Sequence, residues 1–183
     1  AGQRRVPFMH VEGRFAHYAD DRIQAIALPY KDNDFIFEIL LPAKERRIPL
    51  RELLTIDPWP HLSAAQPGPG SVALPRFDIS SRFKLDRVLQ AAGMTDAFDS
   101  AKADFSVMTA QKQRLFLGQV IQKVRLEIDE EGTTAAAATA ADLIGSLSFD
   151  DHFDFTADRP FVFALRHRST GGLVFLGCWD ASR

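Results

Sequence analysis

The sequence predicts an α+β fold in which mixed and mostly antiparallel β-sheets are accompanied by a few helices. Two observations indicate this class. Short apolar runs separated by polar turns occupy most of the chain, whereas the clearest helical repeat is confined to Leu85–Ala92. The 183 residues contain no internal repeat, and a chain of this length buries a substantial core. We therefore expect one domain over residues 1–183.

The first third of the chain predicts an antiparallel meander. Its three apolar runs are Arg14 to Ala19, Ile23 to Tyr30 and Phe35 to Leu41, separated by Asp20-Asp21 and by the polar residues 31–34. Such spacers are typical of tight turns between neighbouring strands. The third run is almost continuously apolar, which indicates a strand covered on both faces.

The middle of the chain predicts a short helix, an irregular link, a strand and a longer helix. The short helix lies near residues 50–54, the proline- and glycine-rich link covers 58–70, and the strand covers 71–79. In the longer helix Leu85, Val88, Leu89 and Ala92 recur at helical spacing. Ser80 or Ser81 is its predicted cap, and Gly93 its predicted end.

Two further strand patterns follow. Val124, Leu126 and Ile128 alternate with charged residues, which predicts a long strand with one buried and one solvated face. The runs Phe161–Leu165 and Leu173–Leu176 flank a Gly171-Gly172 turn and predict a hairpin that is apolar on both faces.

Charge and apolar patterning exclude two classes of partner. The formal net charge is −2, which argues against nucleic acid and anionic membranes. No apolar run approaches the length of about 18 residues that a membrane span requires. The single cysteine, Cys178, excludes an internal disulfide, and its apolar strand predicts a core position rather than a reactive thiol.

The searches for catalytic patterns are negative. No glycine-rich phosphate loop and no G-x-S-x-G nucleophile turn occurs. The acids and histidine of residues 150–154 match no metal-ligand spacing and are interpreted as a solvated loop. Ser146 and Ser148 have no identifiable base partner. We therefore expect a protein that is not an enzyme and has neither a metal nor a cofactor.

The most unusual segment is DEEGTTAAAATAAD, from Asp129 to Asp142. Between Thr133 and Ala141 it uses only threonine and alanine. A short helix and a disordered linker are two interpretations, although a helix here has no apolar stripe with which to dock. The interpretation that fits better is a segment able to enter a sheet as an extra strand, because no bulk, charge or proline obstructs either face.

Several motifs in this order resemble the serpin family of serine protease inhibitors. Glu130 to Thr139 is similar to the hinge of the family's reactive loop, and the flanking stretches agree. Those stretches are Leu28–Tyr30, Leu40–Pro42, Leu74–Phe77, Phe155–Phe163 and Leu173–Gly177. The resemblance covers nearly the whole chain but only the C-terminal half of a serpin. It implies the C-terminal portion of the serpin fold, with a mobile reactive loop at about residues 130–155.

The resemblance also implies site residues. The loop hinge would consist of Glu130, Glu131, Gly132, Thr133, Thr134, Ala135, Ala136, Ala137, Ala138 and Thr139. Counting from Gly132 as the family does places the reactive bond between Ser146 and Leu147, with Leu143 and Phe149 as alternative recognised side chains. No Lys or Arg occurs between Arg125 and Arg159. The implied target is therefore an elastase-like, chymotrypsin-like or subtilisin-like serine protease.

The implied mechanism is suicide-substrate trapping. The protease would attack the loop and form an acyl-enzyme ester, and the loop would then insert into a sheet and distort the protease before hydrolysis. A second partner would be the missing N-terminal half, without which we expect the chain to associate or aggregate. The expected location is extracellular. The alternative function is a non-inhibitory carrier or chaperone whose loop is cleaved as a simple substrate.

Overall fold

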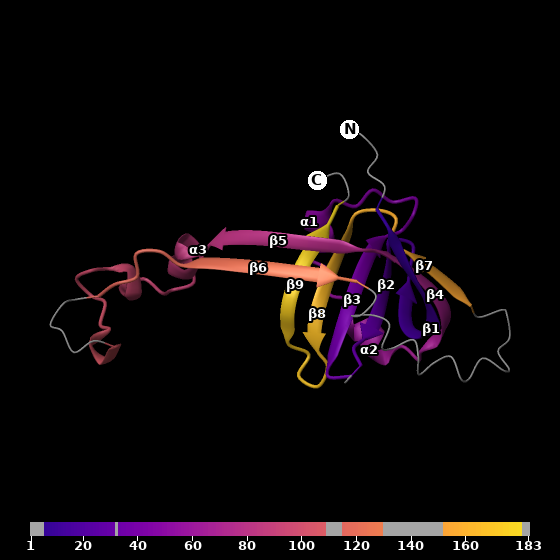
Figure 1. Cartoon of the computed structure of the whole chain (residues 1–183), viewed down its shortest axis with the longest axis horizontal. Coiled ribbons are helices and arrows are strands. Elements are labelled where there is room, and N and C mark those ends of the chain that lie inside the picture. The colour runs from indigo at the N-terminus through magenta and orange to yellow at the C-terminus, as the bar shows by residue number, and fades with distance from the viewer. Residues whose placement is uncertain (1–5, 32, 109–114, 130–151, 181–183) are drawn as a thin grey trace. The chain divides into compact units, whose positions relative to one another are not determined.

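A computed structural model of the chain describes residues 6–31, 33–108, 115–129 and 152–180. They form two compact units, one of residues 1–77 with 128–183 and one of residues 78–127. Nine strands are described (Figure 1): β1 (Phe8–Ala19), β2 (Ile23–Pro29), β3 (Phe35–Pro42), β4 (Gly68–Pro75), β5 (Phe77–Lys84), β6 (Ile121–Ile128), β7 (Phe153–Thr156), β8 (Phe161–His167) and β9 (Leu173–Trp179). The helices are α1 (Leu50–Leu53), α2 (Trp59–Ala64) and α3 (Asp86–Ala91), with 3-10 turns η1 (Asp96–Phe98) and η2 (Ser106–Met108). None of the helices in these residues has the length and hydrophobicity to cross a membrane.

The first unit is built on a seven-stranded sheet with the order β7-β4-β1-β2-β3-β8-β9. The predicted meander is confirmed, because β1, β2 and β3 pair antiparallel in sequence order. Strand β1 is longer than predicted and changes its partner along its length. Residues Phe8–Phe15 pair with β4, and Ala16–Ala19 pair with β2.

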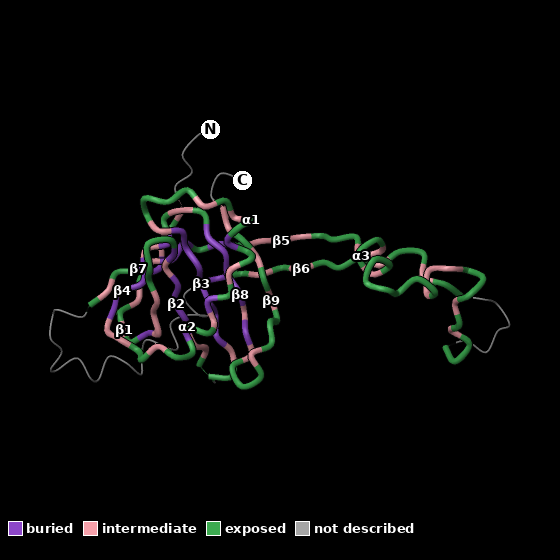
Figure 2. Tube along the Cα trace, turned by 180° about the vertical axis from the view of Figure 1, so that it is seen from behind, coloured by how far each residue is buried: buried purple, intermediate pink, exposed green. Residues whose placement is uncertain are grey.

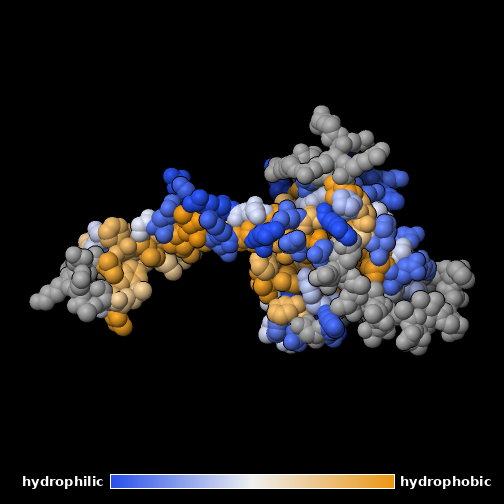
Figure 3. Space-filling view, in the orientation of Figure 1, coloured by the Kyte–Doolittle hydropathy of each residue, from blue (hydrophilic) through white to orange (hydrophobic). Residues whose placement is uncertain are grey.

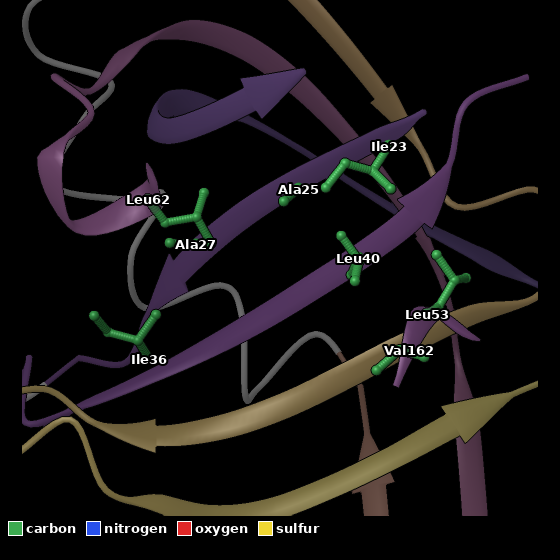
Figure 4. Close-up of a cluster of buried hydrophobic side chains, with 8 residues drawn as sticks. All are labelled: Ile23, Ala25, Ala27, Ile36, Leu40, Leu53, Leu62 and Val162. Atoms are coloured by element: carbon green, nitrogen blue, oxygen red, sulfur yellow. The ribbon is translucent and has the colours of Figure 1, made fainter. Parts of the chain in front are cut away.

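One face of this sheet packs against the two short helices. Leu53 of α1 and Leu62 of α2 are both buried against side chains of β2, β3 and β8 (Figure 4). The cluster consists of Ile23, Ala25, Ala27, Ile36, Leu40, Leu53, Leu62 and Val162. Helix α2 was not predicted, because Pro58 and Pro60 made the segment resemble an irregular link. A proline is tolerated in the first turn of a helix, where its missing N–H has no intrahelical acceptor to lose.

The other face is aromatic. Phe37 stacks on Phe163 at a ring-centroid distance of 5.6 Å, and Phe77 contacts both Phe161 and Phe163. Almost every residue of β3 is consequently buried, as the continuous apolar run predicted. Figure 2 shows the buried residues concentrated in β2, β3 and β8.

Strand β9 is more exposed than its apolar sequence predicted. It lies at the end of the sheet order and pairs with β8 alone among the described residues, and Leu173, Val174 and Leu176 are each about half exposed. Figure 3 shows apolar side chains gathered on the visible surface around β9. Cys178 is also exposed, so its predicted core position is wrong. An apolar sequence pattern indicates burial only where another element covers the strand.

The second unit contains the two-stranded sheet β5-β6 and helix α3. Gly93 follows α3 with a φ of 102°, a backbone conformation that glycine adopts without strain, which confirms it as the end of the helix. The predicted cap is wrong. Ser80 and Ser81 lie within β5, and the residue at the N-cap is Leu85.

The predicted strand 71–79 is in fact two strands. β4 ends at Pro75, and β5 begins at Phe77. The intervening Arg76 extends the β1–β4 ladder by one hydrogen bond, because its N–H donates to the Pro7 carbonyl. Proline cannot donate to a sheet ladder, so a break at Pro75 agrees with its usual place at strand ends.

Candidate functional site

The predicted reactive segment lies outside the described residues. This includes the hinge from Glu130 to Thr139, the bond between Ser146 and Leu147, and the alternatives Leu143 and Phe149. The strands on either side are described, and they belong to different sheets. β6 precedes the segment in the two-stranded sheet, and β7 follows it in the seven-stranded sheet. These two attachments define the candidate site.

The strand before the segment has the predicted alternation. Val124 and Leu126 are half-buried, whereas Arg125 and Glu127 are exposed. Arg125 donates three hydrogen bonds to the Asp78 carboxylate of β5, of 3.1, 3.3 and 2.8 Å, and contacts Glu127 at 3.2 Å. The hydrogen bond from Arg125 holds the pKa of Asp78 below its usual range. This exposed cluster joins β5 to β6 ahead of the segment.

The strand after the segment was not predicted as a separate element. β7 pairs parallel with β4, and the register places Phe153 beside Gly70 and Phe155 beside Val72. Phe155 and Ala157 are fully buried, and the Ala157 N–H donates to the Ala73 carbonyl at 2.9 Å. The only sequence signal for this strand was the alternation of apolar and polar residues in Phe-Asp-Phe-Thr. Four residues are too few to separate a strand from a loop by periodicity alone.

The two faces of β7 are held differently. On one face the Ser71 hydroxyl donates to the Asp154 carboxylate at 2.5 Å. On the other, the Phe153 ring stacks on the His17 imidazole, with a centroid distance of 4.2 Å and an interplanar angle of 9°. A Cβ atom added at Gly70 would lie 2.5 Å from two carbons of that ring, so only glycine fits beneath it.

No metal-binding cluster accompanies these strands in the described part of the chain. The described residues contain no group of three or more His, Cys, Asp or Glu side chains placed to hold a metal. His152 Nε2 lies 3.9 Å from Asp154 Oδ1, and both side chains are exposed as predicted, but Phe153 and Asp154 belong to strand β7 and not to the predicted loop. Asp150, Asp151, Ser146 and Ser148 lie outside the described residues. The described residues place one strand on each side of the predicted segment in the chain.

Comparison with known proteins agrees with this arrangement. A family described as Serpin (serine protease inhibitor) matches residues 1–179. Human glia-derived nexin is 37% identical over 83% of this chain and 38% of its own length. Human leukocyte elastase inhibitor is 32% identical over 96% of this chain and 48% of its own length.

Solved structures have the same fold. The native state of a thermophilic serpin, tengpin, matches 97% of this chain and 46% of its own chain, with a TM-score of 0.73 and 28% identity. The chain therefore spans about half the length of the curated relatives and structures it matches.

Proposed function

This chain belongs to the serpin family, and we propose that the complete protein inhibits a serine protease by suicide-substrate trapping. The observation that carries the proposal is the threonine- and alanine-only tract of residues 133–141, between a strand of one sheet and a strand of another. A segment tied at both ends can present a bond to a protease. A segment without bulk or charge can also enter a sheet after that bond is cut.

The described residues offer an edge that such a segment could join. β6 pairs with β5 alone in the described part of the chain, so the backbone groups of its other edge are available for pairing. The proposed hinge, Glu130 to Thr139, follows β6 after a single residue. A hinge that folds back here would add a strand antiparallel to β6 and gain main-chain hydrogen bonds.

We place the reactive bond between Ser146 and Leu147, with Leu143 and Phe149 as alternative recognised side chains. An elastase-like, chymotrypsin-like or subtilisin-like protease suits the small and apolar residues of this region. A trypsin-like protease does not, since residues 126–158 contain no Lys or Arg. The protein would act as a substrate that captures the protease, without catalysis of its own.

We further propose that residues 1–183 are the C-terminal half of one serpin domain. Its reactive loop follows β6 and leads into β7, so the last residues of the predicted range 130–155 belong to that strand. The preceding half would cover apolar side chains that are exposed in the described residues. Val107 is fully exposed, Val88 is 63% exposed, and Leu173 and Leu176 of β9 are each 53% exposed. Side chains of this kind in such numbers are typical of surfaces that another segment buries. The extracellular location stays a prediction, which secretion of the complete protein from its source cells would check.

The test is to incubate the complete protein with one protease of each proposed class and separate the products on a denaturing gel. The expected result is a covalent complex stable to denaturant, together with a released C-terminal peptide. Mass analysis should show that this peptide begins near Leu147. Cleavage in the loop without a complex would instead identify the alternative, a non-inhibitory protein whose loop is a simple substrate.

A hinge variant makes this test specific to insertion. Ala137→Glu places a charge on the segment without changing the proposed bond, so it should convert the inhibitor into a substrate that is cleaved at the same position. Ala137→Ser, which adds only a small hydroxyl group, is the matched control and should still form the complex. Equal complex formation by both variants would contradict insertion of the hinge.

A further inference from the structure

Strand β7 depends on side-chain packing to stay in place. It has four residues, lies at the end of the sheet order, and pairs with β4 alone among the described residues. So short a ladder contributes few hydrogen bonds, and the aromatic side chains are the large apolar groups of the strand, with Phe155 buried and Phe153 half-buried. Whatever holds the Phe153 ring therefore helps to hold the strand.

The group packed on that ring is titratable. His17 of β1 stacks face to face on Phe153 and meets the edge of Phe155 at a centroid distance of 6.3 Å. Its Nε2 atom is buried and has no hydrogen-bond partner among the described residues. A neutral imidazole tolerates this position, but an imidazolium would hold a charged N–H in apolar surroundings without an acceptor. Burial accordingly lowers the pKa of His17.

The titratable side chains on the elements next to His17 do not face its imidazole. β2 and β4 contain no titratable side chain. On β1, by strand alternation, the neighbouring even positions point to the opposite face from His17; they are His10, Glu12, Arg14 and Tyr18. From α2, His61 stacks on Tyr18. On β7, the Asp154 carboxylate accepts a hydrogen bond from Ser71 on the far face of the strand and pairs with His152. After β1, the Asp20 carboxylate accepts a hydrogen bond from the Ile23 N–H in the β1–β2 turn. No acceptor for a protonated His17 is therefore found on these elements.

We propose that His17 is a pH-sensitive positioning residue for the C-terminal attachment of the reactive segment. The neutral imidazole holds Phe153 and β7 against β4, and protonation releases them. The proposal rests on the proposed function only in treating residues 130–151 as the reactive segment; the packing of β7 does not depend on it.

The direction of the pH effect follows from linkage. In the released state His17 meets water and regains its ordinary pKa of 6.5, whereas the packed state binds the proton less readily. Release of β7 should therefore be independent of pH above about 6.5. Below that value it should increase by up to about tenfold per pH unit until the lowered pKa of the packed state is reached.

Release would change how the segment meets a protease. With both ends held, the reactive bond is presented in a restricted set of conformations. With β7 free, the segment is tethered only at β6, and the ordering that binding requires becomes more costly. We expect association with the protease to slow in the same pH range in which β7 is released.

The test is hydrogen exchange of the complete protein between pH 5 and pH 8, followed by mass spectrometry of peptides that contain residues 153–157. Exchange is corrected for the intrinsic pH dependence of amides. In the wild-type protein the corrected opening of β7 should rise below pH 6.5 as described above. In His17→Phe, which keeps a ring on Phe153 and removes the titration, it should be constant within about twofold. His152→Gln is the control for the neighbouring histidine and should retain the wild-type profile.

Three outcomes would overturn the proposal: a flat wild-type profile, an unchanged profile in His17→Phe, or loss of the profile in His152→Gln. If His17→Phe does not fold, an NMR titration of the His17 ring in the wild-type protein tests the proposal instead. Its midpoint must lie below 6.5, at the pH where the rise in β7 opening levels off, and a midpoint at or above 6.5 contradicts the proposal. Exchange requires no protease, so a failure of inhibition leaves this result intact and the two proposals fail separately.

Discussion

The guanidinium of Arg166 in β8 lies 2.7 Å from the carboxylate of Glu38 in the neighbouring strand β3, and both side chains are almost completely buried. Arg166 also donates to Asp57 at 2.8 Å and to the Gly171 carbonyl, and its guanidinium lies 5.3 Å from the centre of the Trp59 ring. Burial raises the pKa of Glu38, while the hydrogen bond from Arg166 acts in the opposite direction. The pair joins the central strands of the sheet to the segment that leads into α2.

Removal of one partner should be more harmful than removal of both. Arg166→Met leaves the Glu38 carboxylate buried without its cation, and we expect a loss of about 3–5 kcal/mol in the free energy of unfolding. The double variant Arg166→Met with Glu38→Met should be markedly more stable than the single one, because no uncompensated buried charge remains and the carboxylate of Asp57 is exposed. Chemical denaturation of the complete protein measures both. Arg22→Met, which breaks an exposed pair with Glu52, is the control and should change the midpoint little.

Gly70 should tolerate no side chain because of Phe153. Gly70→Ala places a Cβ 2.5 Å from the ring, and we expect a loss of about 1–3 kcal/mol with faster hydrogen exchange in β7. Gly68→Ala in the same strand is the matched control, since nothing lies within 4 Å of its added Cβ. Equal effects of the two substitutions would show that the Phe153 ring does not rest on Gly70.

Asp20 should stabilise the β1–β2 turn in a pH-dependent way. Its carboxylate accepts hydrogen bonds from the Ile23 N–H at 2.7 Å and the Arg22 N–H at 2.8 Å, and these bonds lower its pKa below the usual 3.8. The stabilisation is therefore complete above about pH 4 and is lost as the pH falls through the lowered value.

At pH 7, Asp20→Ala should lower the free energy of unfolding by about 1 kcal/mol. Urea denaturation from pH 7 to pH 3 should show the difference from wild type shrinking only at the acid end. Asp20→Asn keeps one acceptor oxygen and is the control for the lost charge. A difference that shrinks already between pH 7 and pH 5 would contradict this account.

The isolated 183-residue chain should self-associate through β9. Leu173 and Leu176 are half exposed on a strand that pairs with β8 alone in the described residues. Leu176→Lys should shift sedimentation toward the monomer. Ser169→Lys adds the same charge in the exposed turn before β9 without removing an apolar side chain, and it should leave association unchanged. A shift of equal size in both variants would point to net charge as the cause.

Local patterns predicted much of the fold. Several features are encoded within a few residues of where they act. They are the reversals of the chain after β1 and after β2, the alternation in β6, and the glycine at the end of α3. For the candidate site, the only local signal was the tract from Thr133 to Ala141. A run of nine residues without a bulky or charged side chain is rare enough to be informative by itself. The hinge and reactive bond were thus proposed from sequence and stay proposals.

The attachments of that site were decided by tertiary structure. The pairing of β7 with β4 joins Phe153 to Gly70, and the stack of His17 on Phe153 joins two strands far apart in the chain. A four-residue strand such as β7 is too short to be recognised from its alternation. The structural roles of Gly70 and His17 could not be predicted from the sequence, because they depend on the ring of Phe153, which is distant in the chain. By itself the sequence determined which segment we propose to enter a sheet. Only the tertiary structure decided what holds β7, the strand that follows this segment. Its contacts with Gly70 and His17 join residues that are far apart in the sequence, and no local pattern predicts such contacts.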